Sequence, residues 1–371
     1  MKRRRRKKRA IRYRWIGLLG VCAVLAILVV AGVEKPKVET KPKEEPEVEQ
    51  PQEKPNYVLE IPEEEEKEEE IQITISAAGD CTLGTDKNFN RNTNFVAMYN
   101  EKKDPSYFLK KVQSAFANDD LTIVNLEGTF TKSNNRQDKQ FAFKGDPEYT
   151  AILTEGSVEA VNLANNHSRD YGMDSLSDTR KYLDEAGVVH FGYEETAIVE
   201  CKGVKIGLVG IYELPDGLGR LQQVKDNIKK VKDEGATLVI VSFHWGVERE
   251  YYPESIQKKL AHTAIDEGAD LVLGHHPHVL QGIETYKGKK IAYSLGNFCF
   301  GGNSNPSDKD TMIFQQTFTI KDGEVVLDEN VNIIPCSLSS VSNRNNYQPK
   351  ILKGDEAKRV LKRIKKYSKG L

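Results

Sequence analysis

The chain has 371 residues, of which 38% are hydrophobic and 29% are charged, so it is long enough for one large folded domain with additional segments. Its formal net charge of -1 conceals a segregation: ten of the first 14 residues are Lys or Arg, whereas residues 34–70 carry 15 Glu against 6 Lys. The rest of the chain is close to neutral, which argues against a nucleic-acid partner, because nucleic-acid binding needs a basic surface.

An uncharged apolar run, residues 16–33, follows the basic tail, residues 1–14, with Trp15 between them. As a helix this run would span roughly 27 Å, close to the hydrocarbon thickness of a bilayer. Because a positive flank stays in the cytoplasm, the sequence predicts a transmembrane signal anchor over residues 15–33 with the following chain outside the cell. A cleaved signal peptide is the alternative, although the run is long for one and no clear cleavage site follows it.

Residues 34–70 hold six of the chain's 14 prolines and almost no large apolar residue. Such a segment cannot bury enough apolar surface to offset its conformational entropy, so we expect a disordered, extended stalk. Its acidic end, residues 63–70, has an alternative interpretation as a cation site or a mimic of an anionic polymer.

The folded domain is expected over residues 71–371 and begins with a strand, because Ile71, Ile73 and Ile75 alternate with polar residues. Apolar runs of strand length then alternate with stretches whose apolar residues recur at helical spacing. This alternation predicts an α/β sheet. The predicted strands are 121–125, 158–163, 204–211, 237–242 and 271–273, and the predicted helices are 105–117, 221–234 and 255–267.

After residue 279 the pattern changes to hairpins, in which two β-like runs flank a short turn with Gly. The late strands should therefore be antiparallel, in contrast to the earlier ones. The two predicted hairpins pair 283–286 with 290–294 and 312–320 with 324–334.

Two further segments allow alternative interpretations. Residues 358–371 predict a basic amphipathic helix that docks on the domain through Val360, Leu361 and Ile364, or else contacts a polyanion or lipid head groups. Residues 301–310 predict a polar loop, which either covers a site or is a disordered connector.

Polar residues suited to metal binding follow the predicted strands, and three of the chain's seven histidines fall within residues 275–278. Taken singly, each is compatible with a turn, a helix cap or a packed side chain. Carboxylate, amide and imidazole groups that meet at one sheet edge form a ligand set for one or two divalent ions, with imidazole suited to Zn, Mn or Fe. The candidates are Asp80, Glu127, Asn166, His167, His244, His276 and His278.

These residues lie in motifs that resemble the CapA/PgsA-type capsule and poly-γ-glutamate biosynthesis family, over roughly residues 71–334. The resemblance implies a calcineurin-like metallophosphoesterase fold, a four-layer αββα sandwich. It also implies a bacterial cell-surface protein that works with membrane synthase or export subunits on an anionic γ-linked polyglutamate. The motifs are Gly79-Asp80, Asn125-Leu126-Glu127-Gly128, Asn165-Asn166-His167 with Asp170, His244-Trp245-Gly246 with Glu248, His276-Pro277-His278, and Ser294-Leu295-Gly296-Asn297-Phe298.

The resemblance further implies a role for each residue. His167, with Asp170, is implied as the proton donor or charge stabiliser. Two positions depart from the phosphoesterase pattern: Thr82 replaces the histidine of Asp-x-His, and Ser168 replaces the Asp that follows Asn-His. The remaining implied roles are Asp80 and His278 on a first metal, Glu127 as a bridge, Asn166, His244 and His276 on a second metal, Glu248 and Asn297 in substrate binding, and His275 as a structural residue.

Three functions remain open at this level. One is a metal-dependent hydrolase or transferase acting on an anionic polymer or a phosphorylated precursor. Another is a non-catalytic, polymer-binding subunit of a synthase or export complex, and the third is a metal-dependent hydrolase of cell-wall or γ-glutamyl amides. His167 favours catalysis, whereas Thr82 argues against a standard phosphodiesterase.

Overall fold

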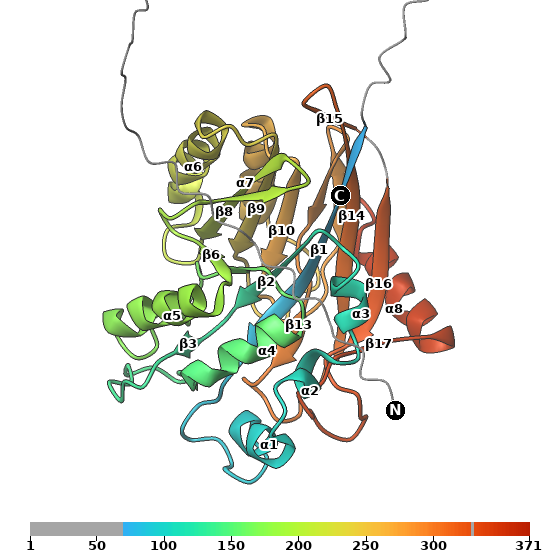
Figure 1. Ribbon diagram of the computed structural model, residues 1–371. Helices are drawn as coiled ribbons and strands as arrows, with labels where there is room; N and C mark the ends of the chain where they lie inside the picture. The colour runs from blue at the N-terminus through green and yellow to red at the C-terminus, as the bar shows by residue number, and fades with distance from the viewer. Residues whose placement is uncertain (1–69, 328–329) are drawn as a thin grey trace, which may run out of the picture. The chain divides into compact units, whose positions relative to one another are not determined.

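A computed structural model of the chain describes residues 70–327 and 330–371 (Figure 1). Within these residues, the strands form one sheet of nine strands, one of six and a small pair. The larger sheet contains β1 (Ile71–Thr82), β2 (Leu121–Leu126), β5 (Ala160–Asn162), β6 (Val189–Phe191), β13 (Asn297–Phe300), β14 (Asp310–Lys321), β15 (Glu324–Val326), β16 (Val331–Ser337) and β17 (Lys350–Ile351). The smaller sheet contains β7 (Ala197–Cys201), β8 (Val204–Tyr212), β9 (Leu238–His244), β10 (Leu271–His275), β11 (Ile283–Tyr286) and β12 (Lys289–Ala292), and the pair is β3 (Thr129–Phe130) with β4 (Lys144–Gly145).

The central strands are apolar because both of their faces are covered. In β9, Leu238 and Ile240 pack between the two sheets, whereas Val239 and Val241 pack against helices. Successive strand residues point to opposite faces, so a strand covered on both sides needs a continuous apolar run. These runs are the pattern from which the strands were predicted.

The two sheets pack face to face, since one buried cluster contains Ile73 of β1, Ile206 of β8 and Leu271 of β10. Helices cover the outer face of each sheet (Figure 1). The predicted mixed α/β class is therefore confirmed. Against the larger sheet lie α1 (Phe95–Lys102), α2 (Ser106–Leu109), α3 (Gln113–Phe116), α4 (Thr150–Glu155) and α5 (Met173–Ala186), and against the smaller lie α6 (Leu221–Asp233) and α7 (Ser255–Asp266). Two short 3-10 helices, η1 (Pro147–Tyr149) and η2 (Gly217–Arg220), complete these layers.

Strand direction follows the prediction with exceptions on both sides, since the late strands β12 and β13 also pair in parallel, with β10 and β1 respectively. β1, β2, β5 and β6 pair in parallel, as do β8, β9 and β10. β11 with β12 and β14 with β15 form the two expected antiparallel turns. Among the early strands the exception is β7, which runs antiparallel to β8 because the two are joined by a tight turn at Lys202 and Gly203.

Two predicted elements are interrupted. The helix predicted at 105–117 consists of α2 and α3, because Val112 leaves the helical region with φ -123°. The strand predicted at 324–334 consists of β15 and β16, which both pair with β14. Between Val326 and Val331 the chain advances five residues while its partner advances only three, from Thr319 to Gln316, so the ladder cannot continue.

The C-terminal helix α8 (Gly354–Tyr367) docks on the domain, as predicted, but through a different face. Val360 and Ile364 are buried four residues apart, whereas Leu361 is 41% exposed. Successive helix residues are about 100° apart, so Leu361 cannot share the face of its neighbour. Tyr367, one turn further on, completes the buried face instead.

No helix within the described ranges is both long and apolar enough to cross a bilayer. The predicted basic tail, the anchor at 15–33 and the stalk as far as residue 69 lie outside those ranges.

Candidate metal centre

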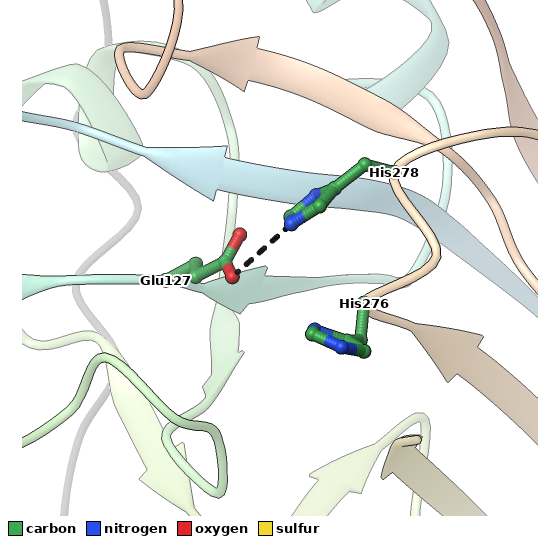
Figure 2. Close-up of side chains that lie close together, drawn as sticks. All are labelled: Glu127, His276 and His278. Atoms are coloured by element: carbon green, nitrogen blue, oxygen red, sulfur yellow. Dashed lines mark ion pairs between the residues drawn. The ribbon is translucent and has the colours of Figure 1, made fainter. Parts of the chain in front are cut away.

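The predicted ligands come together where the ends of two strands from each sheet meet. Asp80 lies near the end of β1, Glu127 follows β2, and His244 ends β9. Figure 2 shows Glu127 pointing toward His278, with His276 at the start of the loop that follows β10. Polar side chains at the carboxyl ends of parallel strands commonly form the binding sites of α/β proteins.

Glu127 is the centre of this arrangement. Its Oε1 lies 3.7 Å from Nε2 of His278, 3.8 Å from Nε2 of His244 and 3.9 Å from Nε2 of His167. The carboxylate is fully buried, and neither oxygen has a hydrogen-bond partner among the described residues. A buried carboxylate without a partner costs several kcal/mol, so these residues fit a cation.

Three ligand atoms are close enough to share one ion. Those of Glu127, His276 and His278 lie within 4.8 Å of one another, and Nδ1 of His276 is buried without a hydrogen bond. Both histidines adopt left-handed backbone conformations, with φ 94° at His276 and 58° at His278. Side chains rarely tolerate this conformation, and such strain is concentrated at functional sites.

Asp80, whose implied role is to bind the first metal together with His278, lies in direct contact with that histidine. Its Oδ2 lies 3.2 Å from Nδ1 of His278, the ring nitrogen that also lies 2.8 Å from Asn297. Asn125 donates a hydrogen bond of 2.9 Å to Oδ1. Burial opposes ionisation of Asp80, but the hydrogen bond and charge of His278 outweigh it and lower the pKa of the carboxyl.

The histidines divide into one cation and several neutral rings. Burial disfavours charge on His278, but Glu127 and Asp80 outweigh it and raise its pKa to about 10. Burial lowers the pKa of His244 well below its usual value and lowers that of His276 to about 3. Neutral imidazoles are the form that binds metals, so His244 and His276 are ready to bind an ion, whereas His278 must first release a proton. Burial also raises the pKa of Glu127 to about 8.

Asn166 lies beside His244 at the other side of the centre. Its Oδ1 is 2.9 Å from Nε2 of His244, and the second ring nitrogen of His244 is 3.3 Å from Nδ2 of Asn125. The amide oxygen and the imidazole therefore reach the same point from different sheets.

His167 and Asp170 form a pair at the edge of the centre. Nδ1 of His167 lies 2.7 Å from Oδ2 of Asp170, so Nε2 points toward Glu127. Asp170 is held by the backbone N–H of Phe143 and by Lys139, whose Nζ is 2.8 Å from Oδ1. Ser168 instead contacts Tyr193 and Asn165, so Asp170 takes the position beside the histidine that Ser168 leaves vacant.

His275 is not part of the ligand group of Glu127, His276 and His278. Its ring is buried, neither ring nitrogen has a hydrogen-bond partner among the described residues, and Nδ1 is 3.6 Å from Oδ1 of Asp80. Burial lowers its pKa to about 4. Thr82 is also buried, and its hydroxyl has no described partner. Neither His275 nor Thr82 makes a short contact that would replace the absent histidine of the Asp-x-His pattern.

A cleft of about 150 Å³ opens onto His167 and His278. Glu248 and Asn297, predicted as substrate-binding residues, both line it, and so do residues of the 301–310 loop. That loop therefore forms a wall of the cleft, which favours the covering role over the disordered connector. The sequence did not single out the aromatic wall of Phe141, Phe143 and Phe300, nor Arg249; the long stretch between β3 and β4 without any periodic pattern is the signal that points to the first two.

Residues 74–302 match the family described as bacterial capsule synthesis protein PGA_cap. The chain is 29% identical to "PGA biosynthesis protein CapA" of Bacillus subtilis, over 62% of this chain and 63% of that protein. It is 30% identical to "Capsule biosynthesis protein CapA" of Bacillus anthracis, over 62% of this chain and 61% of that protein. A hypothetical protein from Thermus thermophilus, of known crystal structure, aligns with a TM-score of 0.43 and 15% identity over 71% of this chain and 99% of that one.

The matched part spans less than two thirds of the length of either Bacillus relative. The family match itself covers more than half of the 371 residues. The chain therefore belongs to the bacterial capsule synthesis protein family PGA_cap.

Proposed function

We propose that this chain is a membrane-anchored, extracytoplasmic protein of bacterial capsule synthesis, whose buried centre binds a divalent metal and hydrolyses or transfers an anionic polymer or a phosphorylated precursor. The observation that carries the proposal is Glu127, a fully buried carboxylate without a described hydrogen-bond partner and with three imidazole nitrogens 3.7–3.9 Å away. Two packed sheets with outer helices, and ligands at their strand ends, support a domain of the calcineurin-like metallophosphoesterase type.

Glu127, His276 and His278 would hold one ion, of Mn, Fe or Zn, with Asp80 beside His278, and His244 and Asn166 would hold or orient another. When bound, such an ion supplies a Lewis acid and activates water for hydrolysis. The mixture of one carboxylate with imidazoles fits these metals better than Mg or Ca, which prefer oxygen ligands alone.

The chain's own residues supply proton transfer and positioning. Asp170 fixes the tautomer of His167, since its carboxylate accepts a hydrogen bond from Nδ1 and leaves Nε2 to face the cleft. A histidine held in this way accepts a proton at Nε2 and, once protonated there, can donate it to a leaving group. The ring of Phe143 packs against that of His167, with centroids 4.4 Å apart and a tilt of 36° between the planes, which limits the access of water to it.

The N-terminal sequence and the names of the relatives support the proposed cell-surface placement and partners. The basic tail and apolar run support an anchor at 15–33 that exposes the domain outside the cell. The name of the Bacillus subtilis relative refers to PGA biosynthesis, which supports poly-γ-glutamate as the polymer. We infer that the chain acts beside membrane synthase or export subunits.

Two observations favour a second candidate function, a non-catalytic subunit that binds polymer. Thr82 stands where a metal ligand is expected, and Asp80 is engaged by His278 instead of lying with Glu127. A centre with an incomplete first site would bind an ion and carboxylates without turnover.

Metal content and hydrolysis, measured on the full chain in mild detergent, separate the two functions. The substrates are phosphodiesters, phosphomonoesters and γ-glutamyl amides, the last of which tests for amide hydrolysis. We expect His278→Ala to lose the metal, and His167→Ala to keep the metal but lose about 10²–10⁴-fold in kcat.

His262→Ala is the matched control, because His262 lies outside the centre and bonds to Glu284. It should retain both metal and activity. A wild-type protein that holds no metal at micromolar supply contradicts the metal centre. Normal metal binding without turnover of any substrate, together with polymer production that survives His167→Ala in cells, identifies the non-catalytic subunit.

A further inference from the structure

A second pocket, of about 270 Å³, borders the metal centre and shares no lining residue with the cleft described above. It reaches the centre through Asn166, whose Oδ1 contacts His244. His167 lines the cleft, whereas its two chain neighbours, Asn166 and Ser168, line the second pocket. The centre therefore lies between two separate hollows.

Arg169 supplies the unpaired charge of this pocket. Its side chain is exposed, its guanidinium lies 4.8 Å from the centre of the Tyr193 ring, and no ion pair joins it to a described residue. Arg220, the other arginine of the pocket, is instead neutralised by Asp216 at 2.6 Å. A guanidinium stacked on an aromatic ring keeps its edge free to bind an oxyanion with two hydrogen bonds.

Tyr193 gives Arg169 a rigid support. The Tyr193 hydroxyl bonds to Ser168 and donates to the carbonyl of Asn165 at 2.9 Å, and its own carbonyl accepts a bond of 2.7 Å from Asn227. The backbone of Tyr193 is left-handed, with φ 63°. These contacts fix a conformation that would otherwise be unfavourable, so little ordering is needed when a ligand binds.

The cleft on the other side of the centre has a matching cation, Arg249. It is also exposed and also without an ion pair to a described residue, and its backbone is left-handed, with φ 66°, as that of Tyr193 is. Its backbone N–H donates a bond of 2.8 Å to the carbonyl of Pro277, so its position is tied to the loop that carries His276 and His278.

Each arginine is accompanied by a carboxylate, Glu194 in the second pocket and Glu248 in the cleft. A simple inorganic anion gains nothing from such a neighbour, because like charges repel. A ligand that carries an anionic group and an N–H donor in each repeat can use both, and an amide-linked chain of acidic residues has this chemistry.

We propose that Arg169, on its Tyr193 support, forms a carboxylate subsite for an amide-linked acidic polymer, and that Arg249 binds another carboxylate of the same chain. The polymer then crosses the metal centre, with repeats bound on both sides of it. This subsite rests on the proposed function for the polymer class, but it requires neither a metal ion nor turnover.

The test is binding of a fluorescent γ-linked glutamate decamer to the full chain in mild detergent, measured by anisotropy in the presence of a chelator. We expect Arg169→Gln and Arg249→Gln each to raise the Kd roughly tenfold, the loss of one charge-assisted contact. Arg169→Lys, which keeps the charge, should recover part of the affinity. Arg91→Gln is the matched control, since Arg91 is exposed and lines neither pocket, and it should stay within about twofold of wild type.

The subsite is overturned if the wild-type protein does not bind the decamer, if Arg169→Gln binds it with wild-type affinity, or if Arg91→Gln weakens it equally. A competition arm with inorganic phosphate distinguishes the source of the oxyanion: phosphate that displaces the decamer only when Arg169 is present marks a phosphate site and also overturns the proposal. Arg169-dependent binding without hydrolysis supports the subsite while contradicting the enzyme. Hydrolysis by the wild-type protein, together with an unchanged Kd in Arg169→Gln, supports the enzyme and contradicts the subsite.

Discussion

Glu127 and Asp80 are both fully buried carboxyls, yet their surroundings shift their pKa values in opposite directions. Asp80 has Asn125 as a hydrogen-bond donor and His278 as a counter-ion, whereas Glu127 has no described hydrogen-bond partner. Burial therefore prevails at Glu127 and raises its pKa to about 8, while the pKa of Asp80 is lowered. A metal ion near Glu127 would supply the positive charge that this carboxylate lacks.

In metal-free protein, stability should fall as pH rises from about 4.5 to about 8, the usual and the folded pKa of Glu127. Over this window the unfolded chain releases the proton of Glu127 and the folded chain retains it, so ionisation favours unfolding. Glu127→Gln is neutral at every pH and should therefore lack this loss of stability, which amounts to about 1.4 kcal/mol for each pH unit within the window. Urea unfolding in the presence of a chelator at a series of pH values measures it.

His278 is the necessary comparison for this measurement. Against the effect of burial, Glu127 and Asp80 raise its pKa from 6.5 to about 10, so it adds a slope of the same sign above pH 6.5, which Glu127→Gln reduces. The difference between wild type and variant from pH 4.5 to 6.5 therefore isolates Glu127. Parallel stability curves over that range would show that Glu127 ionises in the folded protein as readily as in water.

Between elements, the position of the ligands depends on close backbone contact. A Cβ on Gly79 of β1 would lie 1.8 Å from the carbonyl oxygen of Gly296, and one on Gly274 of β10 would lie 1.9 Å from that of Tyr293. Both strands thus approach the segment before β13 more closely than any side chain allows. This explains why the metal-ligand motifs in β1 and β10 each include a glycine next to, or close to, the ligands.

The sequence predicts the central strands well because their signal is local. β2, β8, β9 and β10 are continuous apolar runs, and their predicted bounds differ from the observed ones by at most two residues. Ligands that follow such strands are predicted to meet because parallel strands share an edge. The ligand group of Glu127, His276 and His278 follows from this rule.

What the sequence does not predict depends on contacts between distant residues. The sequence pattern does not predict helix α5, because Ser175 and Thr179 occupy its buried face and interrupt the apolar spacing. Thr179 is buried only because it bonds to Phe130 of β3. The contact of 3.2 Å between Oδ2 of Asp80 and Nδ1 of His278 also joins residues far apart in the chain, so no local pattern predicts it; only the family resemblance implies that the two act together.

Helix α8 fixes the loop that walls the cleft. Nη2 of Arg363 lies 2.6 Å from Asp308, which lines the cleft, and Arg363 also contacts Asp310. Burial opposes ionisation of Asp308, but the hydrogen bonds and charge of Arg363 outweigh it and lower its pKa. The link therefore contributes stability above the usual Asp pKa of about 4 and loses it as pH falls through the lower folded value.

Arg363→Met should lower the free energy of unfolding by about 2 kcal/mol, because Asp308 and Asp310 lose charged hydrogen bonds while the apolar stem is kept. It should also raise the exchange rate of backbone amides in residues 301–310, measured by hydrogen exchange. Lys362→Met is the matched control, since Lys362 is exposed on the same helix and forms no ion pair with a described residue. Equal effects of the two substitutions would mean that the link does not hold the loop.

The candidate metal centre is a point at which buried polar side chains of the two sheets meet. Asp80 and Glu127 come from the larger sheet, and His244, His276 and His278 come from the smaller one. The interior between the sheets is otherwise largely apolar, as at Ile73 and Leu271, although Lys202 beside β7 also bonds to the carbonyl of Gln72 in β1. An ion held by both sheets would bind the folded state and not the unfolded one, and would therefore stabilise the whole domain.

Removal of metal should accordingly lower the thermal midpoint of the domain. An ion at a concentration 100 times its Kd contributes about 2.7 kcal/mol, which for a domain of this size corresponds to a shift of roughly 4 °C. Differential scanning calorimetry with a chelator, followed by addition of Mn or Zn, measures the loss and its recovery. His276→Ala removes one ligand from the smaller sheet and should abolish the metal-dependent part of the shift. If the variant still gains the full shift on metal addition, the ion binds elsewhere and does not join the two sheets.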